Sequence, residues 1–202
     1  MSLLSDEFNL DRCPSCYVAR PRLSQLWKTE TGSHSGGNKR HWGVYVCRTC
    51  GGLVTAFARN ERGLAEEWYP RGAAVDSAIP SPASDYLKQA IESSSAPDGA
   101  LMLAAASVDA MLKAKGLTKG TLNDRIDEAA ETHLITGDMA KWAHQVRLES
   151  NSSRHADVDR PLGTTEDAVR TITFAQALGT FMFVLPSMVT RGIADSTPPA
   201  ST

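Results

Sequence analysis

Apolar residues in the larger, C-terminal part of the chain recur every three or four positions, which is the period of an amphipathic helix. One such stretch begins at Asp98, a residue type that caps helices, and stops at Gly116, a residue type that ends them. Thr164 is followed three residues later by Asp167, and this partial capping box marks another helix start. The predicted helices are Asp85–Ser93, Asp98–Lys115, a third that carries Leu122 to Leu134 and stops at Gly137, a fourth that starts near Asp138, and a fifth that opens at Thr164 and is kinked or ended by Pro186.

The N-terminal part has a different pattern, with short aromatic and β-branched runs that are typical of strands. Trp42–Val46 and Leu53–Phe57 are two such runs, and the Gly/Ser-rich segment Thr31–Asn38 before them is a loop. Prolines and glycine punctuate the segment between the two patterns, and each proline favours an extended residue before it. We therefore expect an α+β chain that is mostly α: a small β module at residues 11–68, a linker at 69–84, a bundle of about five helices at 85–192 and a disordered tail at 193–202.

Charge separates the same two parts. The formal net charge of the 202-residue chain is −2, which argues against a protein that coats nucleic acid over its whole surface. Residues 11–71 hold ten Lys and Arg against five Asp and Glu, whereas residues 72–202 hold eleven against sixteen. The β module is therefore the part that would face a polyanion, although two solvated surfaces of opposite charge explain the split as well.

The N-terminus predicts a cytoplasmic protein. Met1–Asn9 carries two acidic residues and no basic one, so it lacks the positive start of a signal peptide. Thr171–Thr190 contains no charged residue and is long enough to span a membrane, but its threonines, Gln176 and Pro186 make it too polar for a span. We expect a buried helix there and no membrane partner; the alternative is a membrane-associated chain that uses this segment.

All four cysteines lie in the β module, in two pairs of equal spacing. Cys13 and Cys16 form the first pair, Cys47 and Cys50 form the second, and Gly51 permits the tight turn that follows. Four thiolates suit tetrahedral Zn²⁺ and leave no open position, so the spacing predicts a zinc ribbon with a structural zinc ion. A reducing compartment disfavours a disulfide framework, and the absence of a βαβ pattern disfavours a redox pair; an iron–sulfur centre would use the same ligands.

The predicted zinc ribbon also carries basic and aromatic side chains. Lys39, Arg40, Trp42 and Arg48 would contact phosphates and stack on the bases of RNA or DNA. The alternative is that Trp42 packs in the small core of the ribbon while the basic side chains are solvated.

The fourth predicted helix carries the second candidate site. At 100° per residue, His144, Arg147, Asn151 and His155 fall within an arc of about 80°. Such a polar stripe either lines a groove or forms a hydrogen-bond network with another helix. In the network interpretation, Arg147 pairs with an acid such as Asp109, while Asn151 and His155 bond to the backbone or to a neighbouring helix.

The run Arg147-x-x-Ser150-Asn151-x-x-x-His155 resembles the R-x-x-G-N-x-x-x-H signature of an uncharacterised bacterial domain family. That family belongs to the HEPN group of helical, nucleotide-binding domains, its members often accompany type I restriction subunits, and cysteine-pair ribbons commonly precede its helical domain. The resemblance extends over residues 11–190. Other segments resemble family features in the same order: Trp68-Tyr69-Pro70 and Ile79-Pro80 the entry linker, Val108-Asp109 the LE pair of the second helix, and Thr164-Thr165-Glu166-Asp167-Ala168 the start of the last helix.

The resemblance implies a HEPN-like bundle that dimerises, in a protein associated with restriction–modification or phage defence. The expected function is that of an accessory or interaction protein, and the expected partners are a second copy of the chain, RNA or DNA, and a protein of a defence system. The alternative is a metal-independent ribonuclease, in which His155 is general acid or base, Arg147 stabilises the transition state and Asn151 orients the scissile phosphate. Ser150 stands where active ribonucleases of the group have an arginine, and Ala104–Ala106 stands where the family often has another, so the catalytic pattern is incomplete.

Overall fold

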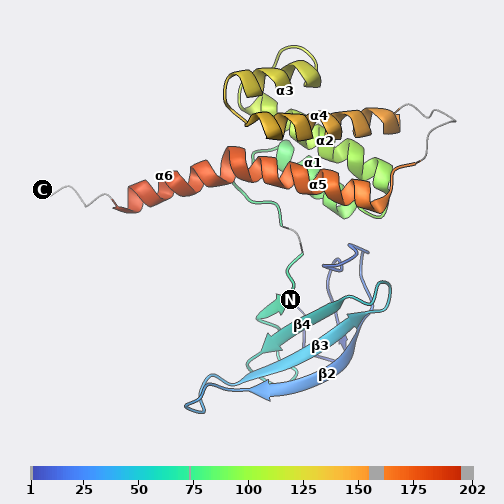
Figure 1. Ribbon diagram of the computed structural model, residues 1–202. Helices are drawn as coiled ribbons and strands as arrows, with labels where there is room; N and C mark the ends of the chain where they lie inside the picture. Colours follow the sequence, from blue (N-terminus) through green and yellow to red (C-terminus); the bar gives the residue numbers. More distant parts are fainter. Residues whose placement is uncertain (1, 73, 155–161, 197–202) are drawn as a thin grey trace, which may run out of the picture. The chain divides into compact units, whose positions relative to one another are not determined.

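The computed structural model describes residues 2–72, 74–154 and 162–196, with the backbone alone for residues 151–154. The chain divides into two compact units, Met1–Ala74 and a second that begins at Val75, and each is described by itself. The first unit is built from strands and the second from helices (Figure 1). The architecture is therefore mixed α and β, with an N-terminal antiparallel sheet, as the sequence predicts.

Five antiparallel strands make up the first unit, in the order β1-β2-β3-β4-β5. β3 (Arg40–Cys47) and β4 (Leu53–Ala58) contain the two predicted strands. The sequence pattern does not predict β2 (Leu23–Thr31), because a register shift just before Trp27 leaves both Leu26 and Trp27 exposed and breaks the alternation that identifies a strand. The two remaining strands are short: β1 (Glu7–Phe8) and β5 (Glu67–Tyr69).

The N-terminal segment closes this sheet. Leu3 pairs with Leu64, backbone hydrogen bonds flank the pair, and the same segment continues into β1 alongside β2. The sheet thus curls around a buried core, in which the rings of Phe8 and Tyr45 stack with their centroids 5.0 Å apart. Closure brings together side chains that are more than fifty residues apart in the sequence.

α2 (Pro97–Ala114) is the central helix of the second unit (Figure 1). It packs against α1 (Ala83–Glu92), α3 (Leu122–Glu131), α4 (Gly137–Arg154) and α5 (Thr165–Gly179). Its predicted apolar face is buried and includes several alanines, whose small side chains let neighbouring helices approach closely. The helices expected near residues 85, 98, 122, 138 and 164 are all present.

Capping boxes begin α3 and α5, the second at the predicted pair Thr164 and Asp167. The prediction that the third helix continues to Gly137 is wrong. α3 ends at Glu131, because His133 adopts a left-handed backbone with φ of 58°, and Gly137 begins α4 instead.

Pro186 does not end the last helix. A π-helical segment, Thr180–Val184, follows α5 and leads directly into α6 (Leu185–Ser196), so that α5 and α6 run as one helix (Figure 1). A proline clashes with the carbonyl one turn before it, and a wider turn in that region relieves the clash. The prediction of a disordered tail is wrong for residues 193–196, which are helical, and the rest of that tail lies outside the described residues.

Burial changes along this long helix. Thr165–Ser196 is long and apolar enough to cross a membrane by length and composition, and 33% of its most apolar window is buried. The expectation of a buried helix at Thr171–Thr190 is met in α5, where Ile172 and Phe174 are buried, but is wrong for α6, which contributes no buried residue. An apolar part of α6 is therefore exposed at the surface.

Candidate functional site

The four cysteines converge near one end of the sheet. Cys47 ends β3 and Cys50 follows it, while Cys13 and Cys16 lie between β1 and β2. All four sulfur atoms lie within 4.8 Å of one another, and the Sγ atoms of Cys13 and Cys50 are 3.9 Å apart. None of the four forms a disulfide. Tetrahedral thiolates with metal–sulfur bonds of about 2.3 Å lie about 3.8 Å apart, so the cluster has the dimensions of a metal centre.

The same backbone turn builds both halves of this cluster. The Tyr17 N–H donates to the Cys13 carbonyl at 3.0 Å, and the Gly51 N–H donates to the Cys47 carbonyl at 2.8 Å. Both donor residues have a left-handed backbone, with φ of 56° at Tyr17 and 77° at Gly51. A glycine adopts this conformation at no steric cost, so the second turn is visible in the sequence, whereas the first is not.

The protonation of the thiols points to a cation between them. Burial acts most strongly and raises the pKa of Cys47, but hydrogen bonds from the backbone N–H groups of Cys50 and Thr49 and from the side chains of Cys13 and Cys50 together outweigh it and lower that pKa to about 7. Burial and the neighbouring sulfurs of Cys50 and Cys13 raise the pKa of Cys16 to about 12. Four thiolates this close repel one another, so a positive ion is needed before all four lose their protons. These residues therefore fit a metal ion held by four sulfurs.

The four predicted nucleic-acid contacts of the first unit do not lie together. The guanidinium of Arg40 lies 4.7 Å from the ring centroid of Phe57, and the ring of Trp42 packs against the same side chain at 4.9 Å. Lys39 precedes Arg40 in the turn between β2 and β3. Arg48 follows the opposite end of β3, eight residues on and roughly 26 Å along the strand. Only the first three can contribute to one surface.

The polar stripe predicted on the fourth helix lies on α4. His144 Nε2 is 3.0 Å from a carboxylate oxygen of Asp127 on α3. Arg147, one turn later, lines a groove between helices. Asn151 belongs to α4, but its side chain is not among the described ones, and His155 lies outside the described residues. The structure therefore places one member of the proposed catalytic set.

A groove of about 850 Å³ runs between α2, α3 and α4 and reaches the start of α1. Alanines of α2 form part of its floor, and among the described residues its charged lining comprises three cations and one acid. The Nε atom of Arg147 is buried there and has no hydrogen-bond partner in the described part of the chain. A buried N–H without a partner costs free energy that a bound acceptor would recover. The groove therefore suits an anion. Its charged residues are Asp109, Lys113, Arg125 and Arg147.

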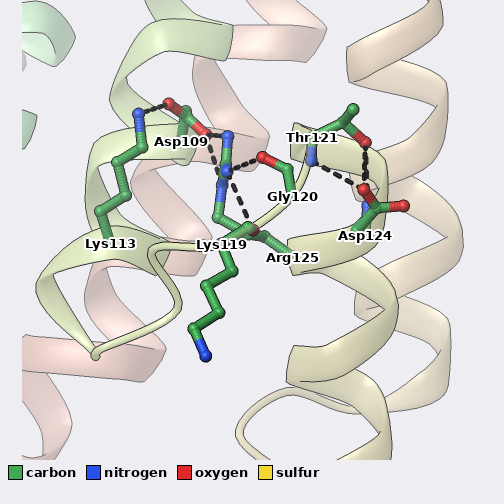
Figure 2. A network of polar contacts seen from close by, with 7 residues as sticks. All are labelled: Asp109, Lys113, Lys119, Gly120, Thr121, Asp124 and Arg125. Atoms are coloured by element: carbon green, nitrogen blue, oxygen red, sulfur yellow. Dashed lines mark hydrogen bonds and ion pairs between the residues drawn. The ribbon is translucent and has the colours of Figure 1, made fainter.

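Asp109 is held by two cations in this groove (Figure 2). Arg125 Nε donates to Asp109 Oδ1 at 2.9 Å, and Lys113 Nζ lies 2.6 Å from Asp109 Oδ2. Arg125 also donates to the carbonyls of Lys119 and Gly120, which precede α3. With 8% of its side chain exposed, Arg125 ties the start of α3 to α2.

The hypothesis that Arg147 pairs with Asp109 is therefore wrong, because Arg125 and Lys113 occupy that carboxylate. The sequence analysis did not select Arg125. The available signal was its place on the third helix, directly before Ile126 and at the edge of the apolar face, where a charged side chain needs a partner.

A comparison with protein families matches residues 88–192 to a domain of unknown function (DUF4145). The matched region is slightly more than half of the chain; it contains α2 to α5, and it leaves out the four cysteines. No curated protein and no solved structure matches the chain.

Proposed function

The chain belongs to the DUF4145 family, and we propose that it is a HEPN-like accessory protein that acts through contacts with other macromolecules. The proposed active form is a cytoplasmic homodimer in which the helical units associate and the N-terminal zinc ribbons bind a protein or nucleic acid of a defence system. The single observation that carries this proposal is the exposed apolar face of α6.

That face is a continuous stripe, here called the α6 stripe and made of Phe181, Leu185, Met188 and Val189. At 100° per residue the three positions on α6, Leu185, Met188 and Val189, fall within an arc of about 100°. Phe181 precedes them in the π-helical segment. All four side chains are exposed, from 39% for Phe181 to 60% for Val189. The stripe continues into an apolar cavity of about 410 Å³ that Trp142, Phe174 and Leu185 help to line. Contiguous apolar surface of this kind marks an interaction site.

A second copy of the same helix fits the stripe. If two α6 helices pack antiparallel about a point between Met188 and Val189, Leu185 of each faces Gly192 of the other. A Cβ atom built on Gly192 would meet no atom within 4 Å, so there is room for the leucine. Pairing a large with a small side chain at facing positions is what close helix packing requires.

Light scattering coupled to size-exclusion chromatography tests this dimer. We expect the full chain to have the mass of two copies at micromolar concentration, and Leu185→Glu with Met188→Glu to reduce it to one copy. Thr190→Glu, an exposed polar position on the other side of the same helix, is the matched control and should leave the dimer intact. A wild-type chain that stays monomeric at 100-fold higher concentration contradicts the proposal.

For the cysteine cluster we propose zinc. Thiolates are soft ligands, and four of them in a tetrahedral arrangement select zinc or an iron–sulfur cluster. The proposed ion is structural, because four sulfurs leave no coordination position for a substrate. Elemental analysis of protein purified without added metal should find one zinc per chain, and a stoichiometric amount of iron with visible absorption would overturn the assignment.

A second candidate function is supported by the buried Nε atom of Arg147, which has no hydrogen-bond partner among the described residues. In this alternative the groove holds RNA, Arg147 neutralises the phosphate, and Asn151 orients it. His155 takes the proton of a ribose 2′-hydroxyl as its oxygen attacks phosphorus, and the 5′-oxygen leaves with a proton returned to it. No metal ion takes part in this scheme.

Labelled total RNA, incubated with the chain in EDTA, separates the two functions. Cleavage that is lost in His155→Ala and in Arg147→Ala, with the helical circular dichroism unchanged, would establish the ribonuclease. Lys141→Ala is the control, because Lys141 is an exposed cation of the same helix that pairs only locally with Asp138. If no RNA is cleaved, the ribonuclease is excluded under these conditions and the accessory function is the one that remains.

A further inference from the structure

Both faces of the sheet in the first unit carry apolar side chains. One face packs on the core through residues such as Tyr45. In an antiparallel sheet with one solvated face, the positions that alternate with the core residues are polar. Here many of them are aromatic or aliphatic, and we call this side the outer face. Its apolar residues include Trp27, Trp42, Val44, Val46, Leu53 and Tyr69.

The strand register brings two exposed rings of the outer face into one row. Trp27 on β2 and Tyr69 on β5 lie at its two ends, and residues paired across a sheet point to the same side. The two side chains are 59% and 46% exposed. Three strand spacings of about 4.8 Å separate their backbones by about 14 Å. The row consists of Trp27, Val44, Thr55 and Tyr69.

Trp42 supplies a third ring in the next row of the outer face. Its Nε1 atom donates to Thr31 Oγ1 at 2.8 Å, and its ring packs against that of Phe57 with the centroids 4.9 Å apart. These contacts hold the ring in place before any ligand arrives, so binding costs less conformational entropy than it would for a free side chain.

The charge on the outer face suits an anion. The charged residues at its strand positions in β2 to β5 are Arg40 and Glu67. The Glu67 carboxylate accepts a hydrogen bond from the Tyr69 hydroxyl, whereas Arg40 forms no ion pair with a described residue and lies over the ring of Phe57. The hydrogen bond to Glu67 raises the pKa of Tyr69, and the charges of Arg71 and Arg40 oppose that rise. Two guanidinium groups therefore act near the Tyr69 end of the row.

Exposed rings beside an arginine are the features that bind unpaired bases. Bases stack on aromatic side chains while basic groups contact the phosphates. In a duplex the faces of the bases are already stacked on one another, so they are not available to a protein ring. An apolar protein partner would cover the same rings but would leave Arg40 without a counter-charge, and a buried charge without a partner is costly.

We propose that the outer face binds single-stranded nucleic acid, with bases stacked on Trp27, Trp42 and Tyr69 and a phosphate beside Arg40. This inference rests on the function proposed above, in which the first unit binds another macromolecule, and it names the class of that macromolecule and the surface that it occupies. RNA and single-stranded DNA share this chemistry, and the experiment below separates them.

Fluorescence anisotropy with the full chain and labelled oligomers of about 12 nucleotides tests the site, a length within the usual range of single-strand footprints. The probes are oligouridylate, oligothymidylate, a DNA duplex of the same length, and an abasic oligomer that keeps the phosphates and lacks the bases. We expect saturable binding of the single strands and binding at least tenfold weaker for the duplex and the abasic oligomer. Tighter binding of uridylate assigns the face to RNA, tighter binding of thymidylate assigns it to DNA, and equal binding assigns it to either.

Substitutions of the two exposed rings test their role. Trp27→Ala and Tyr69→Ala should each weaken the binding of thymidylate at least fivefold, which is the effect of losing one stacked base. Both side chains are exposed, so thermal unfolding should show little change in stability. Trp27→Phe keeps a ring and should retain most of the affinity. Lys28→Ala is the control, because Lys28 follows Trp27 but pairs with Gly43 on the other side of the sheet and with the carboxylate of Glu61.

Three results overturn the proposal. The first is that no single strand binds. The second is that the duplex or the abasic oligomer binds as tightly as the single strands. The third is that Trp27→Ala and Tyr69→Ala bind like the unchanged protein.

Two further measurements separate this inference from the functions proposed above. Light scattering on the same samples reports the dimer, so a dimer that binds no oligomer overturns this inference alone, and a monomer that binds overturns the dimer alone. Arg147→Ala changes the groove of the second unit and should leave the binding of thymidylate unchanged. Loss of binding in that variant would place the strand in the groove and overturn the assignment to the outer face.

Discussion

Replacing Arg125 with methionine tests how the helical unit is held together. Arg125 is 8% exposed and donates to Asp109 and to the carbonyls of Lys119 and Gly120, so its loss removes the link between α2 and the start of α3. Breaking a buried ion pair costs about 3–5 kcal/mol. Because Lys113 stays with Asp109 and methionine keeps most of the apolar volume, we expect the lower end, about 3 kcal/mol.

Urea unfolding followed by far-UV circular dichroism measures this loss, and with an m value of about 2 kcal/mol/M the midpoint should fall by about 1.5 M. Lys113→Met is the control: its side chain is 48% exposed and Arg125 keeps its own bond to Asp109, so the cost should stay below about 1 kcal/mol. Adding Asp109→Leu to Arg125→Met should restore part of the stability, since it removes a largely buried carboxylate that has only the half-exposed Lys113 left as a partner. Equal costs for Arg125→Met and Lys113→Met would refute the reasoning.

Four further predictions follow from the same structure. Removing the metal with a strong chelator should unfold the first unit, seen as loss of dispersed strand resonances, while the helical circular dichroism persists and zinc restores the rest. The Thr164 N–H and hydroxyl, with help from Arg170, lower the pKa of Asp167 from 3.8 to about 2, so its stabilisation is present above about pH 4 and is lost as the pH falls through 2. Asp167→Asn should cost about 1 kcal/mol in urea unfolding near pH 6 and progressively less as the pH falls towards 2. Gly43→Ala should cost about 1–3 kcal/mol in thermal unfolding, because its Cβ would overlap the buried tyrosine ring. Arg40→Ala should lower the salt slope of RNA binding in fluorescence anisotropy by about 0.7, and an unchanged slope would place RNA elsewhere.

Much of the helical unit could be predicted because its signals are local. A capping pair such as Thr164 and Asp167 acts within four residues, and an apolar face recurs within one helix, so both are visible in a short window of sequence. The incorrect predictions concern two helix ends, whose positions depend on a neighbouring segment. α3 ends early at a left-handed His133, and α6 continues past Pro186 after a wider turn.

The candidate sites show the same difference between local signals and long-range packing. The cysteine spacing was sufficient to identify the cluster, because two short turns bring each pair together. The partner of Asp109 could not be predicted, because Arg125 and Arg147 are both basic residues on helices that pack near α2, and only the packing decides which one reaches the carboxylate.

The sequence alone determined the elements that depend on near neighbours: the cysteine turns, the starts of the helices and the faces that they bury. Tertiary structure decided everything that depends on distant segments. The pairing of Leu3 with Leu64 closes the sheet and creates a cavity that Gln25 and Gly43 help to line, and the packing of α3 and α4 on α2 creates the basic groove. The physical reason is that turns and caps are stabilised by contacts within a few residues, whereas a cavity or an ion pair exists only when remote backbones have reached their final distances.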